Sequence, residues 1–502
     1  MMSIDRTFNK RQWLSVVVLV TIVLAFQLVR IDRPFVGHFA SYQSVMASVA
    51  RNIARENFSE IFLLKSDTLL FHSERSLHLN AFLFPAVIAA ACVKCFGGDF
   101  EFWGRFHAVV FNFLTIFLVM LLAARMFDPN VGVLAAFVFG FSPYTVIYGQ
   151  SFMSEAMATF FMMLSVLLVS PQEGLVKIWK VVWASFFFSI ALLNRIHYIV
   201  FLPGILFLLC SKPCQRGSFW RKGVLFAIMS LFLPALWYGF TLIAPLYFDN
   251  IHTTFFMQPA QAVSGRSFFD LVYWQKVLWI IFFRIFTPLL VPFFILGFFM
   301  IPRKREGVFL LLNIAAGFSL LLLIPRKVFD HDFYLYGVFP FCAILIAFVL
   351  SKIALSIKGA RARLLFYGLG FLCYAALAVR LFIHPLFLAS TEEWRAVELA
   401  RKIWPMLAEN DRIISDQQCP PAFFYYADHP FWAIDFSPGE KKAPGYLKSR
   451  FAPGSYRQEV SRFELAMNDP IAWYEYLRSK GATKVVFLDK GVLEREKRFF
   501  EY

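Results

Sequence analysis

Long apolar segments constrain this sequence more than any other feature, because each can cross a lipid bilayer. A transmembrane helix needs about 20 mostly apolar residues. With 59% apolar and 16% charged residues, the 502-residue chain cannot hide its apolar surface in a water-soluble core. It is expected to be a polytopic α-helical membrane protein with about 11 transmembrane helices: 13–30, 104–126, 131–148, 155–170, 178–194, 197–211, 223–246, 274–301, 307–325, 334–352 and 364–387.

Basic residues predict how these helices are oriented. A net charge of +16 is compatible with nucleic-acid binding, but in a membrane protein Lys and Arg collect in short cytoplasmic loops, so we expect no nucleic-acid partner. Eleven spans place the basic N-terminus and the basic segments 211–222, 302–306 and 351–363 on the cytoplasmic side, if 80–97 is a re-entrant or interfacial helix. The outer side then receives 31–103, 148–155, 194–198, 247–273, 326–332 and everything after about 388.

Two domains follow from the change in composition near residue 390. Residues 1–390 form the transmembrane domain, in which 31–103 is a long first external loop with juxtamembrane helices. Residues 391–502 are expected to form a small extracytoplasmic α/β domain, because helical patterns alternate with strand patterns. The expected helices are 391–410 and 469–482, a turn and helix are expected at 419–430, and the expected strands are 411–416, 431–436 and 483–489.

The stretch 37–58 opens the first external loop and has the pattern of an amphipathic helix. Val45, Val49 and Ile53 recur every fourth residue, opposite polar residues that include Gln43 and Asn52. Such a helix is expected to lie along the membrane surface with its apolar side among the lipid headgroups.

Polar residues at the outer turns are the candidate binding groups. Glu155, at the start of an apolar helix, is either a functional carboxylate or a helix cap, and the sequence leaves both open. Arg195 interrupts an apolar run, where it is either a plain loop charge or a side chain that grips a phosphate by two hydrogen bonds. Positive charge on the outer side runs against the usual loop bias and favours a bound lipid phosphate; it gathers again around Arg326, Lys327, His331 and Tyr334.

The layout resembles the C-type glycosyltransferase superfamily, and most closely the branch of glycosyltransferase family 39, the protein O-mannosyltransferases and the lipid A aminoarabinose transferases. The likeness extends over nearly the whole chain. Its motifs are a first span ending in VRIDRPFVGH, a return helix ending in CFGGDFEFWGRF, the turn YGQSFMSEA and the late stretch HDFYLYGVFP. The resemblance implies a polyprenyl-phosphate sugar donor, an extracytoplasmic active site and inversion at the sugar carbon by direct displacement.

The resemblance also implies roles for individual residues. A carboxylate of the first external loop would take the proton from the acceptor hydroxyl, and cations or a metal would stabilise the leaving phosphate. Glu155 matches the acid of the second turn, Arg195 a basic position, and His331 and Tyr334 the late motif. The acid that usually follows the first span is absent here, so His38, Glu74 or Glu155 would replace it.

These inferences predict an integral, multi-pass glycosyltransferase of the cytoplasmic (inner) membrane. It would move a hexosyl or pentosyl group from a polyprenyl-phosphate donor to a lipid, glycan or protein acceptor at the outer face. No cofactor is certain, and a divalent metal is a candidate if His38, Glu155 and His331 come together. The alternatives are a flippase or transporter for lipid-linked sugars, which predicts ionisable residues near span midplanes and internal repeats, and a catalytically inactive member of the family.

Overall fold

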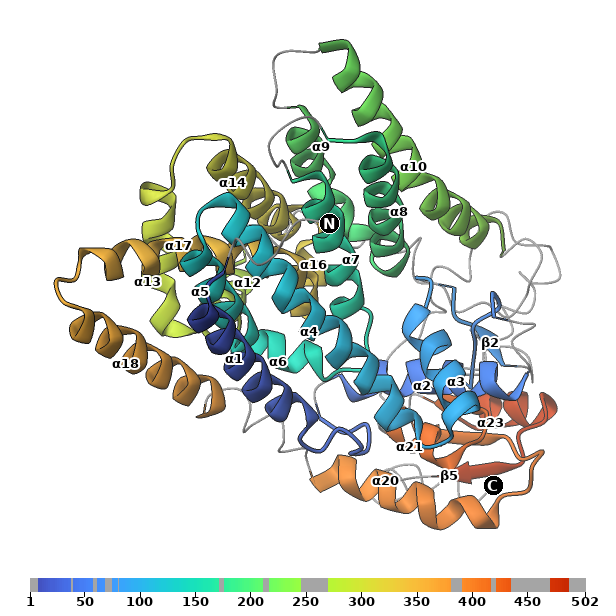
Figure 1. Ribbon diagram of the computed structural model, residues 1–502. Coiled ribbons are helices and arrows are strands. Elements are labelled where there is room, and N and C mark those ends of the chain that lie inside the picture. Colours follow the sequence, from blue (N-terminus) through green and yellow to red (C-terminus); the bar gives the residue numbers. More distant parts are fainter. Residues whose placement is uncertain are drawn as a thin grey trace. The chain divides into compact units, whose positions relative to one another are not determined.

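The computed structural model describes residues 8–37, 39–56, 61–67, 75–79, 81–170, 176–210, 216–244, 270–380, 391–416, 421–434 and 470–486 (Figure 1). The chain divides into two compact units. The first, here called the helical unit, comprises residues 1–31, 105–237 and 260–387. The second, here called the loop–domain unit, comprises residues 32–104, 238–259 and 388–502.

The helical unit is built from apolar helices that occupy the predicted runs. Six described helices are long and apolar enough to cross a membrane, and up to eight if each of two bent pairs counts as one span, so the expected eleven are not confirmed. The helices are α1 (Lys10–Leu28), α4 (Phe100–Met126), α5 (Pro129–Gly140), α6 (Pro143–Gly149), α7 (Glu155–Val169), α8 (Ile178–Asn194), α9 (Leu202–Cys210), α10 (Arg216–Ile243), α12 (Leu271–Trp279), α13 (Thr287–Met300), α14 (Arg305–Phe318), α15 (Leu320–Leu323), α16 (Pro325–Asp330), α17 (Phe339–Ser356) and α18 (Ala360–Ala378).

Helix α17 forms the core of this unit. Within the apolar span 332–356 that contains it, 78% of the most apolar stretch is buried inside the protein, compared with 6% for α18, whose leucines face outward. Helix α17 packs against α5 and α13, and Gly297 of α13 lies so close to Leu345 that a methyl group there would overlap the leucine side chain (Figure 1). The 3-10 turn η6 (Asp332–Val338) leads directly into the start of α17.

Two predicted spans are broken, which corrects the expectation of continuous helices at 131–148 and 274–301. Helices α5 and α6 meet at an angle of 64°, where Pro143 opens α6 behind the N-cap Ser142. The segment of α12 and the π-helical turn η5 (Ile280–Ile285) meets α13 at 100°. Thr287 adopts a positive φ of 59° at that corner and a proline follows it, so the helix cannot continue straight. Sharp breaks in apolar helices are tolerated where protein surrounds the freed backbone groups.

The first external loop folds within the loop–domain unit. Helix α2 (Ala40–Arg55) forms where the pattern predicted it, and Gln43 and Asn52 on its polar side are only 3% and 1% exposed. The polar side of α2 is buried against protein. An antiparallel pair follows, β1 (Lys65–Ser66) with β2 (Ser76–Leu77), and then α3 (Phe84–Phe96), which has 13 residues and is too short to span.

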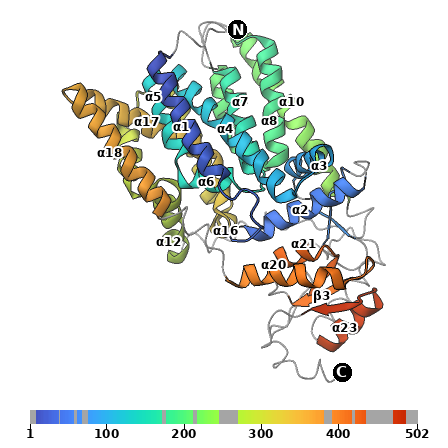
Figure 2. The ribbon, with the colours of Figure 1, turned by 60° about the horizontal axis from the view of Figure 1, so that its bottom comes forward.

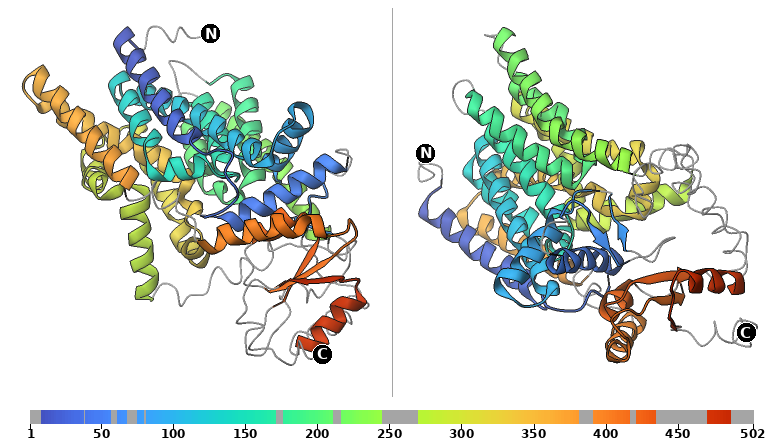
Figure 3. Two further views of the ribbon diagram at one scale, coloured as in Figure 1. Left: turned by 90° about the horizontal axis from the view of Figure 1, so that it is seen from below. Right: turned by 90° about the vertical axis from the view of Figure 1, so that its right-hand side faces the viewer.

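The C-terminal elements of this unit form a three-stranded parallel sheet in the order β4-β3-β5. Strands β3 (Ile413–Asp416), β4 (Phe431–Ile434) and β5 (Lys484–Val486) lie within the segments that alternation predicted as strands. Figure 3 shows them in orange and red beside α23 (Pro470–Ser479). Helices α20 (Thr391–Ile403) and α21 (Pro421–Ala427) pack on each other around Phe423 and Ala400 (Figure 2).

Candidate functional site

A buried ion pair joins the start of α7 to the end of α8. Glu155 opens α7 and is 0% exposed, and Arg195 is the C-cap residue that follows α8. The Arg195 guanidinium pairs with the Glu155 carboxylate, and it also lies 4.8 Å from the centre of the Phe333 ring. A carboxylate at a helix N-terminus is stabilised by the helix dipole, and here it also has a cationic partner. Glu155 therefore serves both as a helix-start acid and as a member of a charge pair.

A second buried carboxylate, Asp332, ties three elements together at the start of η6. Its Oδ1 atom accepts a hydrogen bond from the Tyr148 hydroxyl at 2.6 Å, and its Oδ2 atom accepts one from Arg284 at 2.6 Å. The Tyr144 hydroxyl donates a hydrogen bond to the backbone carbonyl of Asp332. Tyr144 and Tyr148 lie one turn apart on α6, beyond the break after α5, whereas Arg284 lies on η5, just before the 100° bend. The two helix breaks thus deliver their polar side chains to the same aspartate.

Aromatic rings surround both pairs. His331 stacks on Phe333 with ring centres 5.1 Å apart, and Tyr334 lies 4.8 Å from His197. The Tyr198 and Thr159 hydroxyls are hydrogen-bonded at 2.7 Å. The start of η6 therefore brings together three predicted residues from two turns: Arg195 from one, and His331 and Tyr334 from the other. We call this region, made of residues 143–155, 194–198, 279–285 and 325–338, the site end of the helical unit.

The site end can hold an anion and accept a proton. Each of its two carboxylates is paired with an arginine, which offsets part of the cost of burying the charge. Ionised carboxylates accept protons from hydroxyl groups, and guanidinium groups bind phosphate oxygens through paired N–H donors. Few charges of this kind occur inside apolar helices without a functional reason.

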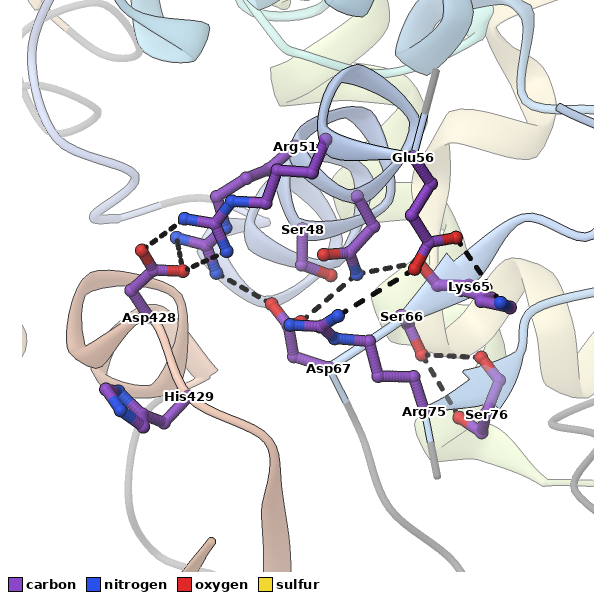
Figure 4. Close-up of polar contacts among 12 residues, drawn as sticks. Ser48, Arg51, Glu56, Lys65, Ser66, Asp67, Arg75, Ser76, Asp428 and His429 are labelled. Atoms are coloured by element: carbon purple, nitrogen blue, oxygen red, sulfur yellow. Dashed lines mark hydrogen bonds and ion pairs between the residues drawn. The ribbon is translucent and has the colours of Figure 1, made fainter. Parts of the chain in front are cut away.

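The loop–domain unit contains a separate ionic network centred on Asp67 (Figure 4). The carboxylate of Asp67 is 3% exposed and accepts hydrogen bonds from Arg51 at 2.7 Å, Arg75 at 3.0 Å and Asn52 at 3.1 Å. Burial alone would raise the pKa of Asp67, but Arg51, Arg75 and the Asn52 hydrogen bond outweigh it and lower the pKa below its ordinary value. The Asp67 carboxylate is therefore charged at neutral pH, which suits a structural role better than proton transfer.

The same network connects α2 to the residue after α21. Asp428 accepts hydrogen bonds from both terminal nitrogens of Arg55 and lies 3.0 Å from the Nη1 atom of Arg51. Arg51 also donates to the backbone carbonyl of Tyr425 at 2.8 Å, and the backbone N–H of Phe431 donates to the Asp67 carbonyl. The first loop and the C-terminal sheet thereby share one buried set of charges.

The rim of this network carries half-exposed charges. Glu56 lies 3.3 Å from Lys65 and 3.9 Å from Arg75, and each of these three side chains is 27–30% exposed (Figure 4). Under this rim, the Ser66 and Ser76 hydroxyls meet at 3.1 Å across the β1–β2 pair. The rim is a surface feature, whereas Arg51 and Asp67 lie beneath it.

The remaining predicted residues divide into placed and unplaced ones. His38 and Glu74 lie outside the described residues. Arg326 and Lys327 lie on α16, where Arg326 is exposed and Lys327 is half-buried. The roles assigned to Glu155, Arg195, Arg326, Lys327, His331 and Tyr334 stay predictions.

Sequence analysis missed several members of these clusters. Arg284 had a usable signal, because it is a charge inside the apolar run 274–301. Asp332 and Asp67 had none, since an acid in a polar loop is ordinary and only the fold shows that each is buried.

The candidate metal site receives no support from the part of the chain described here. Within it, no group of three or more His, Cys, Asp or Glu side chains is placed to hold a metal ion. His331 and Glu155 belong to different contacts, with Phe333 and Arg195 respectively.

Comparison with known proteins identifies the fold. Residues 81–238 match the family model described as dolichyl-phosphate-mannose-protein mannosyltransferase. The crystal structure of ArnT from Cupriavidus metallidurans bound to undecaprenyl phosphate is similar with a TM-score of 0.60 and 15% identity, over 86% of this chain and 87% of that one. The archaeal oligosaccharyltransferase AglB from Archaeoglobus fulgidus, in complex with an inhibitory peptide and a dolichol-phosphate, gives 0.60 and 12%, over 95% and 69%. None of the curated protein sequences matches the chain.

Proposed function

From the premise that the chain has the fold of the C-type glycosyltransferase superfamily, as its sequence motifs indicated, we propose that it transfers a sugar from a polyprenyl-phosphate donor to a hydroxyl-bearing acceptor. The proposal includes about 11 spans, an inner-membrane location, an outward-facing site and an extracytoplasmic domain at 391–502. The acceptor is a lipid, a glycan or a protein, and the sugar is a hexosyl or pentosyl group.

One observation carries the proposal beyond the fold. The site end holds two buried carboxylates, each paired with an arginine, Glu155 with Arg195 and Asp332 with Arg284, at the opposite end of the helices from the basic loop 302–306. By the charge rule for loops, that end faces outward. A reaction that displaces a phosphate and deprotonates a hydroxyl needs both kinds of group in a site of low dielectric constant.

The chemistry assigned to the site is a single displacement. The acceptor oxygen forms a bond to the sugar carbon while the bond from that carbon to the phosphate oxygen breaks, and the configuration inverts. The acceptor proton passes to a carboxylate, and the polyprenyl phosphate leaves with its negative charge. Of the three candidate bases, His38, Glu74 and Glu155, we propose Glu155, because it is buried at the site end beside the guanidinium of Arg195.

The test is a transfer assay with the purified full-length protein in lipid nanodiscs. Polyprenyl-phosphate sugars are supplied with lipid, glycan and peptide acceptors, and the released polyprenyl phosphate is quantified. We expect release to depend on acceptor and to fall at least 100-fold in Glu155→Gln, within the range that a positioned base contributes. Release that is unchanged in this variant would refute the role of Glu155.

A flippase is the second candidate function. It is tested in vesicles by following a labelled lipid-linked sugar across the bilayer. Movement without any acceptor-dependent release of polyprenyl phosphate would replace the proposed transferase by a flippase. The buried charges of the site end do not favour this alternative, because they cluster at one end of the helices rather than near their middles.

A further inference from the structure

His429 lies at the edge of the parallel sheet where its strands begin. The first residues of β3, β4 and β5 are paired in register, so the segments that lead into these strands meet at one edge. His429 stands two residues before β4 and is only 6% exposed. Figure 4 shows its ring on the same turn as Asp428 but directed away from the arginine that pairs with Asp428. The imidazole is therefore a buried titratable group with its own set of contacts.

Both ring nitrogens of His429 face backbone carbonyl oxygens. Nδ1 lies 2.7 Å from the carbonyl oxygen of Ala427, and Nε2 lies 2.9 Å from that of Ala408. A carbonyl oxygen only accepts hydrogen bonds, so each nitrogen must carry a proton to form one. A neutral imidazole has a proton on one nitrogen and a lone pair on the other, whereas the imidazolium has a proton on both. The two contacts are therefore complete only when the ring is doubly protonated.

A neutral ring leaves one of the two contacts unfavourable. A nitrogen lone pair then faces a carbonyl lone pair, and a buried polar group that loses its partner costs more than the hydrogen bond contributed. Loss of the proton at Nε2 removes the bond to Ala408, which joins two segments that are distant in the chain. Loss of the proton at Nδ1 removes the bond to Ala427, which fixes the plane of the ring. Either loss loosens this edge of the sheet.

The segment that Nε2 binds is a tight turn, residues 408–411, which leads into β3. The Ala408 carbonyl also accepts a hydrogen bond from the Asp411 N–H at 2.8 Å, and the Asp411 carboxylate accepts one from the Ala408 N–H at 2.8 Å. The other carboxylate oxygen accepts one from the Thr483 hydroxyl at 2.7 Å, just before β5. His429 thereby connects the start of β4 to this turn and, through Asp411, to the start of β5.

The charged groups around His429 make its titration distinguishable from theirs. The Thr483 hydrogen bond, above all, lowers the pKa of Asp411 below its ordinary value, and the nearby charges of Lys484 and His429 add to this effect. The charged residues of the segments that meet at this edge are Glu409, Asp411, Arg412, Asp428 and Lys484. Carboxylates, amines and guanidinium groups ordinarily titrate outside pH 5–8, whereas imidazole titrates within it. A change at this edge between pH 5 and pH 8 is therefore assigned to the imidazole.

We propose that His429 is a pH-sensitive switch of the C-terminal sheet, whose doubly protonated ring joins the turn 408–411 to the start of β4 and whose deprotonation loosens that turn. Only the folded protein places a carbonyl oxygen against each ring nitrogen, so the doubly protonated ring stabilises the folded edge. This contribution is complete at low pH and is lost as pH rises. The inference goes beyond the proposed sugar transfer and does not depend on it.

The experiment measures hydrogen exchange of the full-length protein in nanodiscs at pH 5 and pH 8, corrected for the intrinsic pH dependence of exchange. The amides of Asp411 and Ile413 report on the edge, because they donate to the carbonyls of Ala408 and Pro430. We expect their protection to fall about 10-fold or more from pH 5 to pH 8, the effect of losing a hydrogen bond to a charged group. The α2 amides, residues 40–55, are the internal reference. Unchanged protection at the edge, or an equal fall in α2, would overturn the proposal.

Two variants separate the switch from a general weakening of the turn. His429→Gln has no group that titrates between pH 5 and pH 8, so its protection at the edge should be low and equal at both pH values. Thr483→Val is the matched control, because it removes the hydrogen bond to Asp411 and leaves the imidazole in place. It should lower protection by the same factor at both pH values and keep the pH dependence. A pH dependence that persists in His429→Gln, or disappears in Thr483→Val, refutes the switch.

A spectroscopic measurement on the unmodified protein keeps the proposal testable if His429→Gln does not fold. Both carbonyls that face the ring belong to alanines, so labelling with ¹⁵N-histidine and ¹³C-carbonyl alanine identifies this ring in solid-state NMR by its proximity to two labelled carbons. We expect both ring nitrogens to carry protons at pH 5 and only one at pH 8. The same number of ring protons at both pH values overturns the proposal.

Discussion

Asp67 holds two arginines that differ in burial, which predicts a large difference in their contributions to stability. The Arg51 side chain is 10% exposed and that of Arg75 is 28% exposed, although both donate to the same buried carboxylate. Breaking a buried pair leaves an uncompensated charge and costs about 3–5 kcal/mol, whereas a solvent-accessible pair contributes about 0.2–1 kcal/mol. Arg51→Gln should therefore destabilise α2 far more than Arg75→Gln.

The measurement is hydrogen exchange of the α2 amides, residues 40–55, in the full-length protein. A loss of about 3 kcal/mol in Arg51→Gln or Asp67→Asn speeds exchange through local opening by about 150-fold. A loss below 1 kcal/mol in Arg75→Gln speeds it less than about fivefold. The double variants Arg51→Gln/Asp67→Asn and Arg75→Gln/Asp67→Asn give the two coupling energies. Equal coupling for both arginines, or exchange in Asp67→Asn within twofold of the unmodified protein, would refute this reasoning.

The same carboxylate predicts a pH dependence whose sign is fixed by its lowered pKa. Burial opposes the charged form, but Arg51 and Arg75 overcome it, so the folded protein holds the pKa of Asp67 below the ordinary value of 3.8. A lowered pKa contributes stability above the unfolded value, and this contribution disappears as pH falls through the folded value. Protection of α2 that depends on Asp67 should stay constant from about pH 8 to pH 5 and decline only below about pH 4. A decline centred near pH 6 would contradict the assignment.

Three further variants test other parts of the molecule. Glu155→Gln should lower the thermal unfolding temperature by stranding Arg195, and adding Arg195→Met should restore the temperature but not sugar transfer; recovery of transfer would contradict the proposed role. Gly317→Ala should cost about 1–3 kcal/mol, because the methyl group would overlap η6, whereas Gly239→Ala meets open space and should not destabilise; equal effects on thermal unfolding would refute the packing argument. Arg30→Gly should stabilise by about 1 kcal/mol, since this exposed residue has a φ of 53°, and Arg30→Ala should not.

The sequence predicted those features that depend on local pattern. The helical membrane unit and the positions of β3, β4 and β5 follow from apolar runs and alternation, which need no knowledge of distant contacts, whereas the superfamily resemblance depends on quoted motifs. The breaks were missed because an apolar run has the same composition whether it is straight or bent. Pro143 was a visible warning for the 64° bend, as was the proline after Thr287 for the 100° bend.

The charge clusters could not be predicted, because their members are far apart in the chain. Arg55 and Asp428 are separated by 373 residues, and Tyr148 and Asp332 by 184. The amphipathic pattern of α2 was misleading for the same reason. A polar helix face predicts solvent, but here a buried carboxylate and an amide occupy that face, and nothing in 37–58 reveals that Asp67 will cover it.

The acid missing after the first span is easier to understand once the site end is seen as two charge pairs. A lone arginine buried there would lose its hydration at a cost of several kcal/mol, and a lone carboxylate would be driven toward its neutral form. Pairing Arg195 with Glu155 and Arg284 with Asp332 avoids both costs before any substrate arrives. The proposed base, Glu155, belongs to the start of α7 in the helical unit, so the proposed chemistry does not require an acid directly after the first span.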